Sequence, residues 1–175
     1  MTVHLRDTFN YCPRCGKPAT NVGQHPFDCP HCEFVFFFNP VTAVGGIITD
    51  DEGKVLLLRR ARDPGKGKYG MPGGFVDAGE SVDQALRREV QEEVNLEVTS
   101  IDYLCSLPNN YTYRGITSTV ADVFFTCQVR TFETLKIEES EVIETMLVHP
   151  TEAELGEMAF ASNRQAVELF LARQK

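Results

Sequence analysis

The segment from Ser81 to Val94, SVDQALRREVQEEV, constrains the fold more than any other part of the chain. Its composition and spacing predict an amphipathic helix. At about 100° per residue, one face of that helix gathers apolar side chains, which are Val82, Ala85, Leu86, Val90 and Val94. Glu89 and Glu93 fall within the same face, and Glu92 lies at its edge. The face that should pack against a core therefore also carries carboxylates.

Carboxylates in a packing face need compensation. An unpaired buried carboxylate is costly, and neighbouring carboxylates repel one another. Divalent cations that prefer oxygen ligands would offset this charge. The alternative is an ordinary solvated acidic helix in which Arg87 and Arg88 neutralise the glutamates. The position of Glu89 and Glu93 within the apolar face favours a metal site.

A longer pattern surrounds this helix, beginning at Gly74 and reading GFVDAGESVDQALRREVQEEVNL. It resembles the box of the Nudix hydrolase family, G-x5-E-x7-R-E-U-x-E-E-x-G-U, in which U is a bulky aliphatic residue. The fixed positions hold Gly74, Glu80, Arg88, Glu89, Glu92 and Glu93, and the aliphatic positions hold Val90 and Leu96. Asn95 replaces the late glycine of the box. Because Asn is the best substitute for Gly in a left-handed conformation, we expect the helix to end normally there.

The resemblance implies a fold and a reaction. The fold would be a Nudix-type α/β/α sandwich with a mixed sheet, in agreement with the α/β class that the interleaved strand-like and helical segments indicate. The reaction would be hydrolysis of the diphosphate linkage in a nucleoside diphosphate joined to another moiety. Such chemistry requires charge neutralisation and an aligned water, which Mg²⁺ (or Mn²⁺) can supply. The alternative is a non-catalytic nucleotide-sensing protein that keeps the Nudix fold.

The resemblance also assigns roles to individual residues. Glu89, Glu92 and Glu93 would bind magnesium, with the carbonyl of Gly73 as a further ligand. Glu80 would lie close to the metal and pair with Arg88 to orient the site. The general base would be a glutamate of the box or one further along the chain, for which Glu141 and Glu144 are the candidates.

Substrate contacts are predicted from the residue types near the box. Arg60 and Arg62 precede it, and arginine binds phosphate oxygens bidentately. The alternative is a solvated loop that balances the acidic helix. Tyr111 or Tyr113 could stack on a base, although ordinary packing is the simpler role for each.

Two pairs of cysteines mark the beginning of the chain: Cys12 with Cys15, and Cys29 with Cys32. Two C-x2-C motifs at this spacing predict a structural zinc site with four thiolate ligands. A redox pair or disulfides are the alternative. His25 and His31 are spare ligands that the complete cysteine set makes unnecessary. Cys105 and Cys127 lie in strand-like segments and are expected to be small core residues.

The chain is expected to contain two domains, a zinc ribbon at 1–39 and a Nudix domain at 40–175. Strands are predicted at 41–50, 54–61, 100–109, 117–129 and 142–150, with a loop at 62–75. Capping boxes at 151–154 and at 162–165 predict the starts of two further helices.

A zinc ribbon before a Nudix domain resembles the NADH pyrophosphatase branch of the family. Members of that branch carry a substrate signature after the box that includes Ser, Gln, Pro and Trp. In this chain Ser106 and Pro108 match the signature, but other residues occupy its Gln and Trp positions. We therefore expect ADP-ribose or NAD(H) as the nearest substrate. Members of the family are frequently dimers, so a homodimer is also expected.

Composition limits the partners. The net charge of −8 argues against nucleic acid, because there is no cationic excess to neutralise phosphates. The start of the chain shows no secretory signal, and its longest apolar stretch is too short to span a membrane. The paired cysteines fit a reducing compartment. A cytoplasmic location is the resulting expectation.

Overall fold

The computed structural model describes residues 2–174. Most of the predicted strands and helices are present, with bounds that differ by a few residues. The elements in chain order are β1 (Val3–His4), the 3-10 helix η1 (Leu5–Thr8), β2 (Phe27–Asp28), β3 (Val35–Phe36), β4 (Val41–Ile48), β5 (Val55–Arg60), β6 (Tyr69–Gly70), α1 (Val82–Val94), β7 (Val98–Tyr113), β8 (Ile116–Val129), β9 (Val142–Val148), α2 (Glu152–Gly156) and α3 (Ala161–Arg173).

The chain divides into two compact units. The smaller unit comprises 2–41 together with 110–119, and the larger comprises 42–109 together with 120–174. In the smaller unit β1 runs parallel to the beginning of β8, with Val3 opposite Ile116, and β2 pairs antiparallel with β3. The segment 110–119 includes the tip of the β7–β8 hairpin, whose turn is formed by Arg114 and Gly115, both at positive φ.

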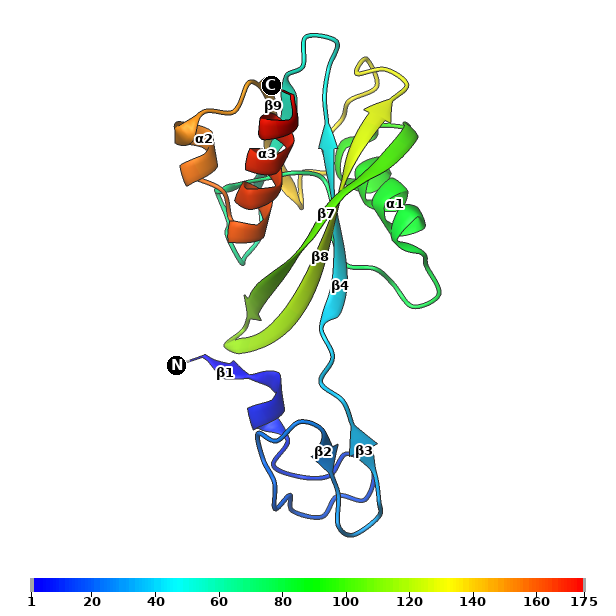
Figure 1. The fold of residues 1–175 in the computed structure, drawn as a ribbon, viewed down its shortest axis with the longest axis vertical. Helices are drawn as coiled ribbons and strands as arrows, with labels where there is room; N and C mark the ends of the chain where they lie inside the picture. The colour runs from blue at the N-terminus through cyan, green and yellow to red at the C-terminus, as the bar shows by residue number, and fades with distance from the viewer. Residues whose placement is uncertain (1, 175) are drawn as a thin grey trace. The chain divides into compact units, whose positions relative to one another are not determined.

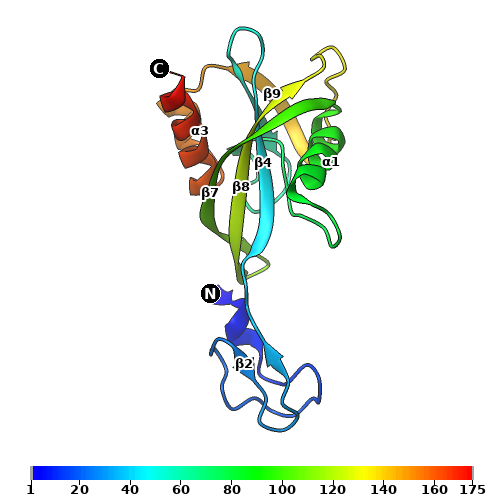
Figure 2. The same ribbon diagram turned by 45° about the vertical axis from the view of Figure 1, so that its right-hand side comes forward.

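The larger unit is built from two groups of strands. One group contains β4 and β7 on β8, and the other places β5 between β6 and β9, both antiparallel to it. Figures 1 and 2 show α1 on one side of these strands and α3 on the other. Helices on both faces of a mixed strand arrangement confirm the predicted α/β class.

Alternate residues of the buried strands face two apolar cores. The core beneath α1 includes Ile48 of β4, Leu56 of β5 and Phe125 of β8, with Ala85, Leu86, Val90 and Val94 of the helix. The core beneath α2 and α3 includes Ile47, Leu57 and Phe124, with Leu155, Ala166, Val167 and Phe170 of the helices. Because successive side chains point to opposite faces of a strand, an uninterrupted apolar run such as VLLL fills both cores at once.

Helix α1 has well-defined ends. Ser81 caps its beginning, accepting a hydrogen bond from the amide of Gln84, whose side chain in turn accepts from the amide of Ser81. Asn95 ends it in the left-handed conformation, with φ 55° and ψ 37°, as predicted. The side chain of Asn95 accepts from Gln91 Nε2 at 2.7 Å and donates to the carbonyl of Thr134 at 2.8 Å. These contacts tie the end of the helix to the chain that follows β8.

The two capping boxes predicted near the C-terminus have different outcomes. Thr151 and Glu154 form the expected box at the start of α2, which is confirmed. The box predicted at 162–165 is wrong, because α3 begins two residues earlier, after Phe160, with no side-chain cap. Ser162 instead donates to the buried carboxylate of Asp122 at 2.6 Å. The predicted loop at 62–75 also contains the short strand β6.

No helix within residues 2–174 is both long enough and apolar enough to cross a membrane.

Substitution of Asn95 tests how α1 ends. We expect Asn95→Ala to lower the free energy of unfolding by about 1–3 kcal/mol, because alanine is strained at positive φ and lacks both side-chain hydrogen bonds. Asn95→Gly keeps the conformation and loses only the hydrogen bonds, so it should lie between wild type and Asn95→Ala. Urea denaturation measures the order. An Asn95→Gly protein less stable than Asn95→Ala would contradict the role given to the left-handed conformation.

Candidate functional site

The glutamates of α1 lie against the loop that precedes the helix. Glu93 is 6% exposed, and its Oε2 accepts the amide hydrogen of Gly73 with an N···O distance of 2.9 Å. A Cβ added at Gly74 would lie 2.4 Å from Glu89 Oε1, and one added at Gly73 would lie 2.1 Å from the carbonyl oxygen of Val44. Any side chain at either glycine would therefore displace the glutamate or the strand beside it.

This loop is held in place by β4. The amides of Gly46 and Val44 donate to the carbonyls of Pro72 and Gly74, each at 2.8 Å. Within the part of the chain that the structure describes, no backbone amide donates to the carbonyl of Gly73, which lies between them. The backbone thus offers an uncommitted oxygen next to the buried carboxylate of Glu93.

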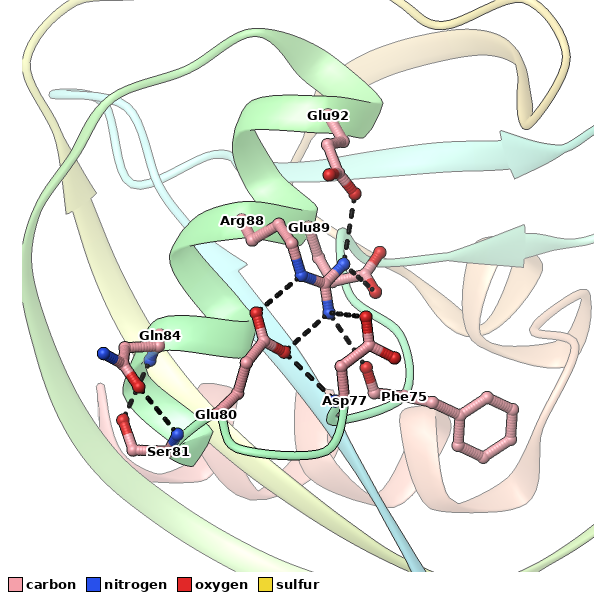
Figure 3. Close-up of polar contacts among 8 residues, drawn as sticks. All are labelled: Phe75, Asp77, Glu80, Ser81, Gln84, Arg88, Glu89 and Glu92. Carbon is pink, nitrogen blue, oxygen red and sulfur yellow. Dashed lines mark hydrogen bonds and ion pairs between the residues drawn. The ribbon is translucent and has the colours of Figure 1, made fainter.

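Arg88 connects the carboxylates of the box (Figure 3). Its guanidinium binds Glu80 through Nε and Nη2, at 2.8 Å and 3.0 Å, which is the predicted pair. Nη1 donates to Glu89 at 2.8 Å and to Glu92 at 3.1 Å. Nη2 also lies 4.0 Å from Asp77. A single cation therefore contacts four carboxylates, and a negative excess is left over.

Two partners of Arg88 were not predicted from the sequence. Asp77 lies within the box at a position that the pattern leaves free, and the carbonyl of Phe75 accepts from Nη2 at 3.1 Å. The only signal for Asp77 was its position three residues before Glu80, whose carboxylate accepts its amide hydrogen at 3.1 Å. Main-chain oxygens such as that of Phe75 carry no sequence signal at all.

The electrostatics differ sharply between the glutamates. Burial, together with the negative charges of Glu89 and Glu141, raises the pKa of Glu93 to about 8, although the amide of Gly73 and the charge of Arg60 oppose the shift. Burial also raises the pKa of Glu89 in spite of its contact with Arg88. The hydrogen bonds from Arg88 hold the pKa of Glu80 below its ordinary value.

Glu92 is the most exposed of the three predicted metal ligands, with 60% of its side-chain surface accessible. The three carboxylates do not converge on one point. Among the described residues, a group of potential ligands whose donor atoms all lie within 4.8 Å of one another is formed by the four paired cysteines instead. Glu89 and Glu92 instead share Nη1 of Arg88, while Glu93 is bound by the amide of Gly73.

The two downstream glutamates have different surroundings. Glu141 accepts from Arg62 Nη1 at 2.9 Å, and its charge raises the pKa values of Glu89 and Glu93. Glu144 faces Arg59 across β5 and β9, with the Arg59 Nε to Glu144 Oε1 distance being 2.7 Å. The structure thus brings Glu141 toward the box and commits Glu144 to a cross-strand ion pair.

The two arginines predicted to bind phosphate also differ. Arg62 donates to Ser140 through Nε and Nη2, at 2.7 Å and 2.9 Å, in addition to its contact with Glu141. All of these contacts of the Arg62 guanidinium are with Ser140 and Glu141, in the loop before β9. Arg60 donates through Nε to the carbonyl of Pro64 at 3.0 Å and lies over the ring of Phe160, 5.3 Å from its centroid. Phe160 was not singled out in the sequence, because it lies one hundred residues from its partner.

Tyr111 and Tyr113 belong to the segment 110–119 of the smaller unit. Tyr111 is half-buried. Tyr113 is 48% exposed, and the guanidinium of Arg114 lies 5.2 Å from its ring centroid.

The four paired cysteines gather in the smaller unit. Cys12 Sγ lies 3.7 Å from Cys32 Sγ, and Cys15 Sγ lies 3.8 Å from Cys29 Sγ. In each pair the residue after the second cysteine, Gly16 or Glu33, is left-handed and donates its amide hydrogen back to the first cysteine's carbonyl. The two pairs therefore form matching turns that point four sulfurs at one centre.

The remaining sulfur and imidazole groups are not part of this cluster. His25 Nδ1 accepts the amide hydrogen of Phe38 at 3.3 Å, and His31 is exposed. Cys127 is buried in the core beneath α1, and burial raises its pKa to about 12. Cys105 packs against the core beneath α3. The two cysteines are therefore core residues, as predicted from the sequence.

The pH dependence of stability tests the burial of Glu93. Its pKa rises from 4.5 to about 8 on folding, so the folded state binds more protons than the unfolded state between these values. Stability should therefore fall as pH rises through this window, by on the order of a few kcal/mol. Because Glu93→Gln stays neutral, we expect it to exceed wild type in stability at pH 8 and to match it near pH 4.5, in buffer free of magnesium and manganese.

Glu97→Gln is the control for this measurement. Glu97 is exposed, and its contact with Arg130 lowers its pKa, so its contribution changes only in more acidic solution. Denaturant titrations at a series of pH values compare the three proteins. Equal slopes of stability against pH for wild type and Glu93→Gln would rule out the raised pKa.

Comparison with known proteins agrees with this geometry. A model of the NUDIX domain matches residues 39–170. The human mitochondrial NAD(P)H pyrophosphatase NUDT13 is 39% identical over 105 residues, which are 59% of this chain and 29% of that protein. An ADP-ribose pyrophosphatase from Methanocaldococcus jannaschii is 44% identical over 64 residues, 37% of each chain. The matches thus span only 29% of the first relative and 37% of the second.

The fold is shared with solved structures. The crystal structure of a NUDIX hydrolase from Nitrosomonas europaea superposes with a TM-score of 0.69 at 24% identity, covering 94% of this chain and 92% of that one. At that identity the likeness concerns the fold alone. The match of the domain model over three quarters of the sequence, together with the arrangement of the box, shows that this chain belongs to the NUDIX domain family.

Proposed function

We propose that this protein is a magnesium-dependent (or manganese-dependent) pyrophosphohydrolase that cleaves the diphosphate linkage of a nucleoside diphosphate derivative, with ADP-ribose and NAD(H) as the nearest substrates. The observation that carries the proposal is the excess of carboxylates around Arg88, together with the buried carboxylate of Glu93 on the same helix. The names of the two relatives, an NAD(P)H pyrophosphatase and an ADP-ribose pyrophosphatase, support the substrate class.

The residues present fit a divalent cation. Arg88 contacts Asp77, Glu80, Glu89 and Glu92, so one positive charge faces four negative ones before Glu93 is counted. Oxygen-rich, negatively charged sites of this kind favour magnesium and manganese. In this proposal Glu89, Glu92 and Glu93 hold the metal together with the carbonyl of Gly73. When bound, such a metal would neutralise phosphate charge and lower the pKa of a bound water.

The chain's own residues supply the remaining functions. Arg88 and Glu80 position the box carboxylates through the bidentate contact between them. Glu141 accepts the proton of the attacking water in this proposal, because its carboxylate is the downstream one close enough to act on Glu89 and Glu93. A box glutamate is the other candidate for the base. Arg62 orients Glu141 through the salt bridge at 2.9 Å.

Arg60 is the better candidate of the two arginines for the phosphates. Its Nε is bound to Pro64, while its positive charge acts on Glu93 and its guanidinium lies over Phe160. A guanidinium beside the carboxylate site could bind the diphosphate of the substrate bidentately. Tyr111 stays a candidate for stacking on a base.

We also propose that the four paired cysteines hold a structural zinc ion and that 1–39 form a zinc ribbon. At a Zn–S distance of about 2.3 Å, two sulfurs of a tetrahedral site lie ~3.8 Å apart. The Sγ···Sγ separations of 3.7 Å and 3.8 Å fit that geometry. None of the six cysteines forms a disulfide, and a reducing compartment such as the cytoplasm would keep them reduced.

Replacement of Glu93 tests the proposed activity. We expect Glu93→Gln to reduce magnesium-dependent hydrolysis of ADP-ribose and of NADH by several orders of magnitude, because it removes a charged metal ligand. Glu97→Gln, on an exposed residue just past the helix, should retain wild-type turnover. Release of AMP from each substrate, measured by chromatography, gives the rates and ranks the two substrates. Wild-type turnover in Glu93→Gln would end the metal assignment.

Metal analysis tests the zinc site. We expect about one zinc per chain by mass spectrometry of the purified protein, and loss of that zinc in Cys29→Ser, since a tetrahedral site needs all four thiolates. Cys105→Ser is the matched control, because Cys105 lies outside the cluster and should leave the zinc content unchanged. Full zinc content in Cys29→Ser would contradict the assignment.

A further inference from the structure

The smaller unit contains a pocket of about 400 Å³, which is large enough for a small ligand. One wall is aromatic and consists of Phe36, Phe37 and Phe38. Phe36 and Phe38 meet edge to face with ring centroids 5.0 Å apart, and both rings also pack against Phe9. Phe37, between them in sequence, is 56% exposed. The wall therefore has a fixed base and one large ring that is open to a ligand.

His25 fixes the position of this exposed ring. Its ring meets that of Phe37 edge to face at a centroid distance of 6.1 Å. Because His25 Nδ1 accepts the amide hydrogen of Phe38, the neutral ring carries its proton on Nε2. His25 lines the pocket as well, so it contributes a polar donor beside the aromatic surface.

The rest of the lining is polar and cationic. Thr117, Ser118 and Thr119 of β8 line the pocket together with Arg6 of η1. The hydroxyl of buried Thr117 is bound to that of Thr112 at 2.8 Å, whereas Thr119 is exposed. Arg6 Nε lies 3.9 Å from Asp7 in an exposed contact, which is a weak pair. Among the described residues that line the pocket there is no aspartate or glutamate, although the chain as a whole carries a net charge of −8. The local charge therefore favours an anion.

We propose that this pocket binds a nucleotide, with the nucleobase against Phe37 and the phosphate at Arg6. An aromatic face and a cation match two parts of that ligand, its base and its phosphate, and the polar residues of β8 and His25 offer hydrogen-bonding groups for its ribose. The nucleotide could be a free mononucleotide or one residue of a single strand, and the chemistry is shared. The site lies within the smaller unit and does not depend on the proposed hydrolysis.

AMP is a suitable probe, because it has no diphosphate linkage and the proposed activity cannot consume it. We expect titration of AMP into the isotopically labelled full-length protein to shift the backbone NMR signals of 36–38 and 117–119. If AMP instead bound at the box as a product of the proposed hydrolysis, it would shift the signals of 73–93. The two events are therefore read separately, so a failure of this proposal is distinguishable from a failure of the proposed function.

Two variants test the contacts. Phe37→Ser removes the stacking surface and Arg6→Ala removes the cation, and each should weaken AMP binding at these signals about fivefold or more. Tyr11→Ser and Lys17→Ala are matched controls on exposed residues of the same unit that do not line the pocket. They should bind AMP like wild type. Hydrolysis of ADP-ribose should be unchanged in all four.

A short single-stranded oligonucleotide distinguishes the two sources. If it shifts the same signals at lower concentration than AMP and loses affinity in higher salt, the pocket receives a nucleotide of a strand. If AMP binds as tightly as the oligonucleotide, a free mononucleotide is the ligand. The proposal is overturned if neither probe shifts the signals of 36–38 and 117–119, or if Phe37→Ser and Arg6→Ala both bind like the controls.

Discussion

The site depends on one close contact, between the glutamates of α1 and the bare backbone at Gly73 and Gly74. The helix packs on the strands through Ala85, Leu86, Val90 and Val94, and the same face brings Glu93 into a place where only 6% of it is exposed. A main-chain amide stabilises the carboxylate there, and glycine alone leaves room for Glu89. The hydrogen bonds from β4 to the loop on either side of Gly73 make that backbone rigid. The packing of α1 and the environment of its glutamates therefore depend on the same backbone at Gly73 and Gly74.

Features that depend on local signals could be predicted from the sequence. The helix from 82 to 94, its left-handed end at Asn95 and the buried strands all follow from spacing, capping residues and apolar runs. The placement of Glu89 and Glu93 in the packing face also follows from helical geometry. The fixed pattern of the box added the pair between Glu80 and Arg88, which the structure contains.

Features that depend on distant partners could not be predicted. Ser162 is of a residue type that often caps helices, but its hydroxyl binds Asp122, forty residues away. This happens because α3 starts earlier than predicted and both side chains are buried. Glu141 and Glu144 look alike in sequence, and only the register of β5 with β9 assigns Glu144 to Arg59. Nothing local indicated that the guanidinium of Arg60 would lie over Phe160. In each case the deciding contact is formed by the fold and is absent from the segment itself.

The position of Arg88 has a consequence for any cation that binds at the box. Its guanidinium is the counter-ion of Glu80, Glu89 and Glu92, so the chain itself partly neutralises these carboxylates. If the box holds a divalent cation, as proposed, that cation would compete with the guanidinium for Glu89 and Glu92. Its binding would then be an exchange between two positive species, with an affinity below what the carboxylates alone would give. The arginine that neutralises the carboxylates would also keep the metal replaceable.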